Sequence, residues 1–286
     1  MKFRFVLACL ALVLSSLPAT LSAEEPSGES LAASTLKQLI QRQKDLLADA
    51  EKQGDRFDQS SFQSQMEAVC RSYEILLRDN PKFTEAYTAY GYLLGKLGQG
   101  HEAASILLKA NELDPNQPLV KNQLGNYLAE DGKPLDALPY YLAAIKLAPK
   151  EPLYHYQLGT LLYEARDDFL KSGEWKAAAI DRAIHEAFRQ AAELAPDRLE
   201  FTYRYAESFY DLTEPDWDAA LHEWEKLEEK ATTEIEKETM RLHEANVLLK
   251  HDEPDEARAR LDTIREPALQ KQKQKLIAQL PAAPEK

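Results

Sequence analysis

The fold is decided by residues 118–151, which read PLVKNQLGNYLAEDGKPLDALPYYLAAIKLAPKE. The 34 residues before them, 84–117, read TEAYTAYGYLLGKLGQGHEAASILLKANELDPNQ and keep the same key positions. The residues that recur at intervals of 34 are Gly91, Gly125 and Gly159, then Pro81, Pro115 and Pro149, then Ala103 with Ala137 and Ala110 with Ala144. Because independent residue types share one period, the sequence predicts a stack of supersecondary units.

Each unit is interpreted as two antiparallel helices. One apolar face of the first helix in 84–117 carries Tyr87, Tyr90 and Leu94. That helix is expected to end at the glycine-rich turn 98–100, and a second helix is expected to end at Asp114. Pro115 follows, and proline lacks an amide proton and disfavours helical angles in its predecessor. Gly91 is small where the two helices must approach closely.

These units resemble the tetratricopeptide repeat (TPR) family, whose pattern places a Leu-Gly pair and an aromatic residue before Ala, aromatic, Ala and Pro positions. In 118–151 the matching residues are Leu124, Gly125, Leu128, Gly132, Ala137, Tyr141, Ala144 and Pro149. The resemblance covers roughly residues 60–265. It implies an all-α fold, a right-handed α-solenoid of antiparallel helix pairs called a TPR superhelix.

The repeat pattern and the character of the two ends predict the organisation of the whole chain. The expected segments are a signal peptide at 1–23, a flexible N-terminal segment at 24–33, a divergent helical pair at 34–83, TPR 1 at 84–117, TPR 2 at 118–151, TPR 3 at 152–198, divergent repeats TPR 4 at 199–232 and TPR 5 at 233–266, and a capping helix with a tail at 267–286. The third repeat holds about 13 additional residues, because Pro149 and Pro196 lie 47 apart instead of 34. Degraded outer repeats suit a capping role.

The insertion in the third repeat predicts a helix pair at 163–183 that projects beyond its neighbours. Residues 166–171 can continue the first helix by nearly two turns, Gly173 breaks it, and residues 174–180 start a lengthened second helix. Phe169 and Trp175 lie near the tip. Two interpretations stay open: the two aromatic side chains contact a partner, or they pack on each other to hold the tip.

The N-terminus has the layout of a secretory signal peptide. Lys2 and Arg4 precede an apolar run over 5–14, and small residues end at Ala23. We therefore expect export, to a periplasm first and to the exterior as the other option. The apolar run is too short to span a bilayer and no later window is long enough, so no stable membrane insertion is expected. Cys70 is then the one remaining cysteine, expected to be buried, and an intramolecular disulfide is excluded.

The composition and the motifs argue against catalysis and nucleic acid. Forty-eight acids against thirty-five bases give a net charge of −13, which repels phosphate backbones. No His-Glu-x-x-His helix, phosphate-binding loop or Gly-x-Ser-x-Gly elbow is present, so no metal site, cofactor site or catalytic residue is predicted. The acid-rich stretch at Glu223, Glu225, Glu228 and Glu229 is interpreted as solvated helix surface.

The remaining candidate is the inner side of the superhelix, which in similar proteins is lined by five positions of each first helix. Carried over by position, the lining is aromatic and acidic, and it includes Glu207 and Asp211. The candidate partner-binding residues are Tyr92, Asn122, Asn126, Tyr156, Tyr163, Tyr203 and Tyr210. Asparagine is a poor helix former whose amide can hold a ligand backbone, and tyrosine is favoured at recognition surfaces. The alternative is that the tyrosine rings pack between neighbouring repeats.

The sequence thus predicts an exported, non-enzymatic scaffold that binds an extended polypeptide with basic or aromatic residues in this groove. The alternative is a structural or assembly factor of the cell envelope that acts by self-association or through the helix pair at 163–183. Some relatives clamp the carboxylate tail of chaperones with Lys, Asn and Arg. The clamp positions here hold Thr88, Tyr92, Gln123, Leu153 and Gln157. Chaperone-tail binding is therefore not expected.

Overall fold

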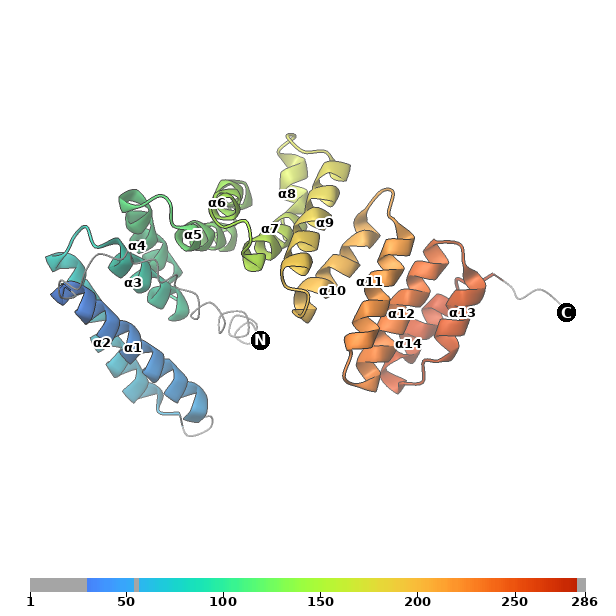
Figure 1. Cartoon of the computed structure of the whole chain (residues 1–286), viewed down its shortest axis with the longest axis horizontal. Helices are drawn as coiled ribbons and strands as arrows, with labels where there is room; N and C mark the ends of the chain where they lie inside the picture. The colour runs from blue at the N-terminus through green and yellow to red at the C-terminus, as the bar shows by residue number, and fades with distance from the viewer. Residues whose placement is uncertain (1–29, 54–56, 282–286) are drawn as a thin grey trace, which may run out of the picture. The chain divides into compact units, whose positions relative to one another are not determined.

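The computed structural model describes residues 30–53 and 57–281 (Figure 1). The predicted signal peptide lies outside these residues, as does most of the segment 24–33. Every regular element in the described ranges is helical. None of the helices in these ranges combines the length and the apolar character that crossing a bilayer requires. The chain divides into two compact units, with the boundary between Pro81 and Lys82.

The first unit is a helical hairpin of α1 (Leu31–Gln53) and α2 (Gln59–Asp79), which pack against each other. Asp58 caps α2 by accepting a hydrogen bond from the amide of Ser61 at 3.0 Å. Inside the hairpin, the buried hydroxyl of Tyr73 donates to Gln43 at 2.9 Å, so a polar pair joins the two helices. Cys70 of α2 is half-buried, and burial raises the pKa of its thiol.

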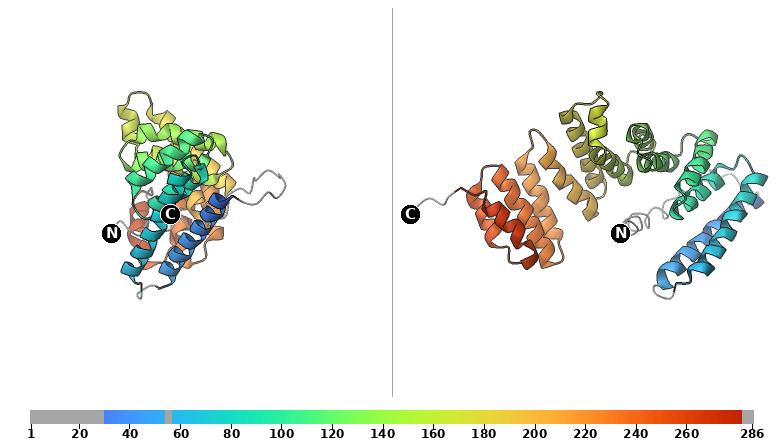
Figure 2. Two further views of the ribbon diagram at one scale, coloured as in Figure 1. Left: turned by 90° about the vertical axis from the view of Figure 1, so that its left-hand side faces the viewer. Right: turned by 180° about the vertical axis from the view of Figure 1, so that it is seen from behind.

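The second unit contains the repeats. Its helices are α3 (Thr84–Lys96), α4 (Gly100–Leu113), α5 (Pro118–Glu130), α6 (Pro134–Leu147), α7 (Pro152–Glu164), α8 (Arg166–Lys171), α9 (Ala177–Leu194), α10 (Leu199–Ser208), η3 (Phe209–Asp211), α11 (Trp217–Lys230), α12 (Glu234–Lys250), α13 (Pro254–Asp262), η4 (Pro267–Leu269) and α14 (Gln270–Ile277). From α3 to α7 and from α9 to α13, each helix packs on the next one along the chain (Figures 1 and 2). The predicted all-α solenoid of helix pairs is confirmed.

A glycine in the first helix of each central repeat lets the second helix approach. An added Cβ would lie 2.6 Å from Leu107 at Gly91, 3.1 Å from Tyr141 at Gly125 and 2.8 Å from Phe188 at Gly159. Such distances are too short for a side chain without movement of the neighbour. The contacting residues are 16 apart in the first two repeats and 29 apart in the third. The 13 additional residues therefore lie between two positions that keep their contact.

Proline and glycine mark the helix ends. The α-helices that begin with proline at their first residue are α5, α6, α7 and α13. After α3 and α5 the chain turns at Gly98 and Gly132, whose φ values are +76° and +73°. Asp252 takes the same turn after α12, with φ of +63°. Only this third turn places a side chain in the left-handed region.

The insertion does not extend the first helix of the third repeat. The helix α7 ends at Glu164, and α8 is a separate short helix that packs on α6, α7 and α9. Arg166 donates to both carboxylate oxygens of the buried Asp181, at 2.7 and 3.0 Å, and this bidentate pair fixes α8 to α9. The expected continuous helix is therefore wrong, because α8 has its own packing contacts.

The C-terminal end of the solenoid is held by one buried carboxylate. Glu238 of α12 is 4% exposed, and its carboxylate accepts hydrogen bonds from the backbone amides of Arg265 and Glu266, at 2.9 and 2.6 Å. These amides belong to the turn that precedes η4 and α14. A capping box between Thr233 and Glu236 starts the same helix. The hydrogen bonds of Glu238 therefore attach the C-terminal segment to α12.

Candidate functional site

A cavity of about 130 Å³ lies where the first helices of the third and fourth repeats, α7 and α10, meet α9 and η3. We call it the repeat 3–4 cavity. Its lining residues are Tyr163, Ile184, Phe188, Arg204, Glu207, Ser208, Tyr210 and Asp211. Four of them, Tyr163, Glu207, Tyr210 and Asp211, occupy positions that the sequence assigned to the groove. The structure thus brings groove positions of two successive repeats to one place.

The charges of the repeat 3–4 cavity leave a net negative lining. The guanidinium of Arg204 lies 4.4 Å from the ring centre of Tyr163 and 5.0 Å from that of Phe188. It also pairs with Glu207 at 2.6 Å, so its charge is matched. Burial and the nearby Asp181 raise the pKa of Asp211, against the lowering effect of Arg166 and Arg204. Within the described residues no ion pair of Asp211 is formed.

Tyr203 and Tyr210 are oriented by a histidine of the fifth repeat. The two hydroxyls lie 3.1 Å from Nε2 and 3.3 Å from Nδ1 of His243. The imidazole stacks on the buried Trp224, with ring centres 3.9 Å apart and planes 7° apart. Burial lowers the pKa of His243 to about 4, so the ring is neutral at neutral pH, with one nitrogen donating and the other accepting.

In this aromatic group Tyr203 packs between the fourth and fifth repeats, and its ring also meets Trp224 edge-on. Tyr210 both packs in the group and lines the repeat 3–4 cavity. The sequence does not single out His243, because no second histidine follows at the spacing of a metal-binding helix. A histidine on an apolar helix face carries no signal that distinguishes it from an exposed one.

Tyr156 also joins two repeats. Its ring lies 4.7 Å from that of Phe201 and 5.7 Å from that of Phe188. Its hydroxyl donates to Glu200 of α10 at 2.9 Å. The side chain is therefore committed to the contact between the third and fourth repeats.

The predicted residues of the first two repeats are less accessible than expected. Asn122 is 0% exposed, and neither polar atom of its side chain forms a hydrogen bond. Its predicted role as a groove contact is wrong in this structure, because α5 is packed between α4 and α6. Asn126 accepts a hydrogen bond from Tyr141 of the same repeat at 2.6 Å. Tyr92 is half-buried, and burial raises its pKa.

Phe169 and Trp175 pack on each other. Their rings meet edge-on at 5.8 Å, and Phe169 is 0% exposed within a core that includes Ile180 and Ile184. The interpretation of Phe169 as a partner contact is therefore wrong, since no part of its side chain reaches the surface. Trp175 is half-buried at the edge of this core.

A second cavity, of about 360 Å³, lies in the first two repeats and is mainly apolar. Leu108, Leu124, Leu128, Tyr127 and Tyr140 are among its lining residues. None of the seven predicted groove residues contributes to it, so the repeat 3–4 cavity is the better candidate despite its smaller volume. Across residues 30–53 and 57–281, no group of His, Cys, Asp and Glu side chains could hold a metal ion.

Family comparison assigns the repeats. Two models described as tetratricopeptide repeat match residues 84–117 and 122–185. No curated protein matches the chain by sequence.

Solved structures share the fold at low sequence identity. YrrB, described as a TPR protein with an unusual peptide-binding site, is 16% identical; the match covers 68% of this chain and 90% of that chain, with a TM-score of 0.56. PilF of Pseudomonas aeruginosa is 14% identical over 86% of this chain and 98% of that chain, with a TM-score of 0.56. MamA of Desulfovibrio magneticus RS-1 is 19% identical; the match covers 72% of this chain and 100% of that chain, with a TM-score of 0.51. The repeat models and the helical stack agree that residues 84–117 and 122–185 of this chain are repeats of the tetratricopeptide repeat family.

Proposed function

We propose that the chain is a non-catalytic scaffold that binds an extended polypeptide along its first helices, with one side chain of the partner in the repeat 3–4 cavity. Proteins of this family act generally as protein-interaction scaffolds. The observation that carries the proposal is the convergence of Tyr163, Glu207, Tyr210 and Asp211 on a cavity of about 130 Å³. Sites for small molecules usually measure about 300–1,000 Å³, so the volume suits a side chain better than a free ligand.

The chemistry of the lining favours a basic or aromatic side chain. Tyr163 is 45% exposed and presents a ring. Asp211 adds a carboxylate that forms no ion pair with a described side chain, while the charges of Arg166 and Arg204 lower its pKa. A cation gains from an aromatic face and from an opposite charge in a partly buried place. Arg204 does not oppose this preference, because Glu207 already matches its charge. A peptide-binding site described for the related fold of YrrB supports the same class of partner.

The protein is further proposed to be exported, and self-association is the alternative function. The signal-like pattern of residues 1–23 supports export to a periplasm or beyond. Cell fractionation, with the mass of the mature N-terminus, tests export. Self-association through residues 163–183 receives less support, because Phe169 is buried in the core of its own repeat. A size that rises with concentration and falls after deletion of residues 166–175 would favour self-association over the groove.

A peptide array tests the partner chemistry. We expect the protein to retain segments with Arg, Lys or aromatic residues over matched segments with Glu. A photoreactive residue in place of Tyr163, the most exposed of the predicted tyrosines, should crosslink to the retained peptide. Preference for acidic segments would overturn the proposal.

Affinity measurements with the best peptide test the cavity itself. Tyr163→Ala and Asp211→Asn should each weaken binding about tenfold, which is about 1.4 kcal/mol. Asp262→Asn is the matched control, because Asp262 is exposed on α13 and outside the cavity lining, and it should leave affinity unchanged. Equal affinity of the wild type and the Tyr163→Ala, Asp211→Asn double variant would show that the peptide binds elsewhere.

A further inference from the structure

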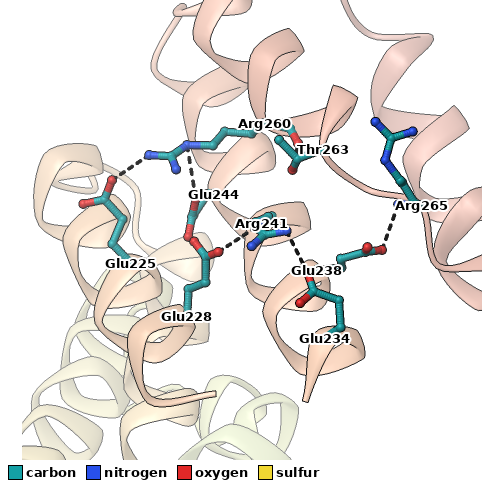
Figure 3. A network of polar contacts seen from close by, with 9 residues as sticks. All are labelled: Glu225, Glu228, Glu234, Glu238, Arg241, Glu244, Arg260, Thr263 and Arg265. Carbon is teal, nitrogen blue, oxygen red and sulfur yellow. Dashed lines mark hydrogen bonds and ion pairs between the residues drawn. The ribbon is translucent and has the colours of Figure 1, made fainter. Parts of the chain in front are cut away.

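A network of carboxylates and guanidinium groups lies between the fourth and fifth repeats (Figure 3). We call it the repeat 4–5 network; its members are Glu225 and Glu228 of α11, Glu234, Arg241 and Glu244 of α12, and Arg260 of α13. Arg241 pairs with Glu228 at 2.5 Å and with Glu234 at 3.1 Å. Arg260 pairs with Glu225 at 2.9 Å and with Glu244 at 3.2 Å. Four carboxyl groups therefore share two cations.

Glu244 is the most confined member. Its side chain is 0% exposed, and neither of its oxygens accepts a hydrogen bond, since Arg260 approaches only as an ion pair. Figure 3 draws its carboxyl group beside that of Glu228, and a hydrogen bond between the two groups is one cause of the raised pKa of Glu244. Two ionised carboxylates can only accept hydrogen bonds, so a bond between them requires a proton. A second buried negative charge at this contact would be strongly unfavourable.

Taken together, the surroundings of Glu244 favour its protonated form. Burial raises its pKa, Arg260 lowers it, and Glu228 and Glu225 raise it, with a net result of about 7. The charged groups that face it from neighbouring helices are Glu225 and Glu228 of α11 and Arg260 of α13. Lys273 of α14, which also packs on α12, donates to the carbonyl of Ile264 instead.

We infer that one proton shared by Glu228 and Glu244 fastens the fifth repeat to the fourth, and that the contact between α11 and α12 weakens when this proton leaves. The direction follows from linkage. An unfolded glutamate titrates near 4.3, whereas folded Glu244 keeps its proton to higher pH. The stabilisation is therefore complete below about pH 4.3, is lost as the pH rises through the folded pKa of about 7, and changes no further above it.

The titration of a neighbouring group changes the stability with pH in the opposite direction, and its contribution must be separated from that of Glu244. Burial lowers the pKa of His243 to about 4, and this residue precedes Glu244 on α12. Its contribution is present above about pH 6.5 and is lost as the pH falls towards 4. The pH profile of the wild type alone therefore combines two opposing effects. The difference between the wild type and a variant at Glu244 isolates the shared proton.

Amide hydrogen exchange of the full-length protein provides the test. The opening equilibrium of peptides within 234–262 would be compared in the wild type and in Glu244→Gln at about pH 5, 6, 7 and 8. Glutamine keeps the shape and donates an amide hydrogen to Glu228, but it does not titrate. We expect the protection of the wild type relative to the variant to fall by up to about tenfold per pH unit between pH 5 and 7, and to level off above it. The matched control is Glu229→Gln, because Glu229 is exposed on α11. The protection of the wild type relative to this control variant should not change with pH.

A second measurement keeps the inference testable if Glu244→Gln does not fold. In D₂O at about pH 6 ordinary carboxyl groups are ionised, so the infrared band of a protonated acid reports the shared proton directly. We expect this band in the wild type and its loss near pH 8, and its absence from Glu228→Gln. A wild type without the band, or a ratio to Glu244→Gln that is constant across pH, would overturn the inference.

Discussion

The central repeats and the joint between the fourth and fifth repeats solve the same packing problem with different groups. In the central repeats a glycine of the first helix faces a large side chain of the second helix of the same repeat, as at Gly159 and Phe188. Between the fourth and fifth repeats the contact is made by polar and aromatic groups, the stack of Trp224 and His243 and the buried carboxyl of Glu244. The first solution is apolar and independent of pH, and the second carries protons and charges.

The difference explains where the repeat pattern is strong. The family models match residues 84–117 and 122–185 and do not extend over the later repeats. A backbone that approaches a ring within van der Waals contact allows only glycine, so the sequence signal is fixed. Polar and aromatic partners can replace one another, so the signal fades although the helices still stack. The predictions below test this contrast, from the largest expected effect to the smallest.

Replacing the aromatic centre of the polar joint should have the largest effect. Trp224→Ala removes a fully buried ring that contacts Tyr203, Tyr210 and His243. We expect a loss of about 3–5 kcal/mol in the free energy of unfolding, measured with urea. Trp217→Ala, at a half-buried ring of the same helix, is the control and should cost less. Equal losses would mean that the stack does not organise this joint.

In the central repeats, a side chain added at one of the regularly spaced glycines should destabilise the protein by overpacking. Gly159→Ala places a methyl group 2.8 Å from the buried ring of Phe188, and we expect it to lower the free energy of unfolding by about 1–3 kcal/mol. Gly100→Ala is the matched control, because its Cβ would meet Tyr127 at an ordinary 3.7 Å. Thermal unfolding of both variants checks the difference. A neutral Gly159→Ala would contradict the close-contact explanation of the 34-residue glycine period.

A third prediction concerns the carboxylate that holds the C-terminal segment. Glu238→Ala leaves the amides of Arg265 and Glu266 without their acceptor, and we expect a cost of about 1–2 kcal/mol. Faster hydrogen exchange of these two amides and of α14 should accompany it. Glu256→Ala, exposed on α13, should change neither. Unchanged exchange in Glu238→Ala would show that α14 is held by its apolar contacts alone.

The smallest effect is expected at the turns. Asp252 has φ of +63° where the central repeats place Gly98 and Gly132. Asp252→Gly relieves the side-chain strain but adds backbone entropy, so we expect a gain of about 0.5 kcal/mol. The reverse change, Gly132→Asp, should cost a similar amount in urea unfolding. A loss of stability in Asp252→Gly, instead of the expected gain, would mean that the Asp252 side chain stabilises its turn.

Much of the fold could be predicted from the sequence because it rests on backbone distances. The glycine and proline period and the size of the insertion follow from contacts that tolerate one residue type. The candidate site was predicted in part: Tyr163 and Tyr210 line the cavity, whereas Asn122 is buried. A position number within a repeat places a residue on a helix face, but it does not say how closely the adjacent helices cover that face.

The buried polar groups could not be predicted at all. Glu228 was interpreted as solvated surface together with its neighbours, and this holds for Glu229, which is exposed. It is wrong for Glu228, whose side chain is 20% exposed and pairs with Arg241. Most glutamates of helical proteins face water, so a buried one is recognised only when its partners are known. His243 and Glu244 belong to the same class.

The insertion of the third repeat ends in a loop that none of the core contacts uses. Ser172, Gly173 and Glu174 are exposed, and Gly173 turns the chain with φ of +77° and open space where a Cβ would lie. Exposed loop tips tolerate foreign sequence better than helix interiors do. This tip is therefore the natural attachment point for an epitope or a fluorescent label, which would report on the protein in cells without disturbing the register of the stack.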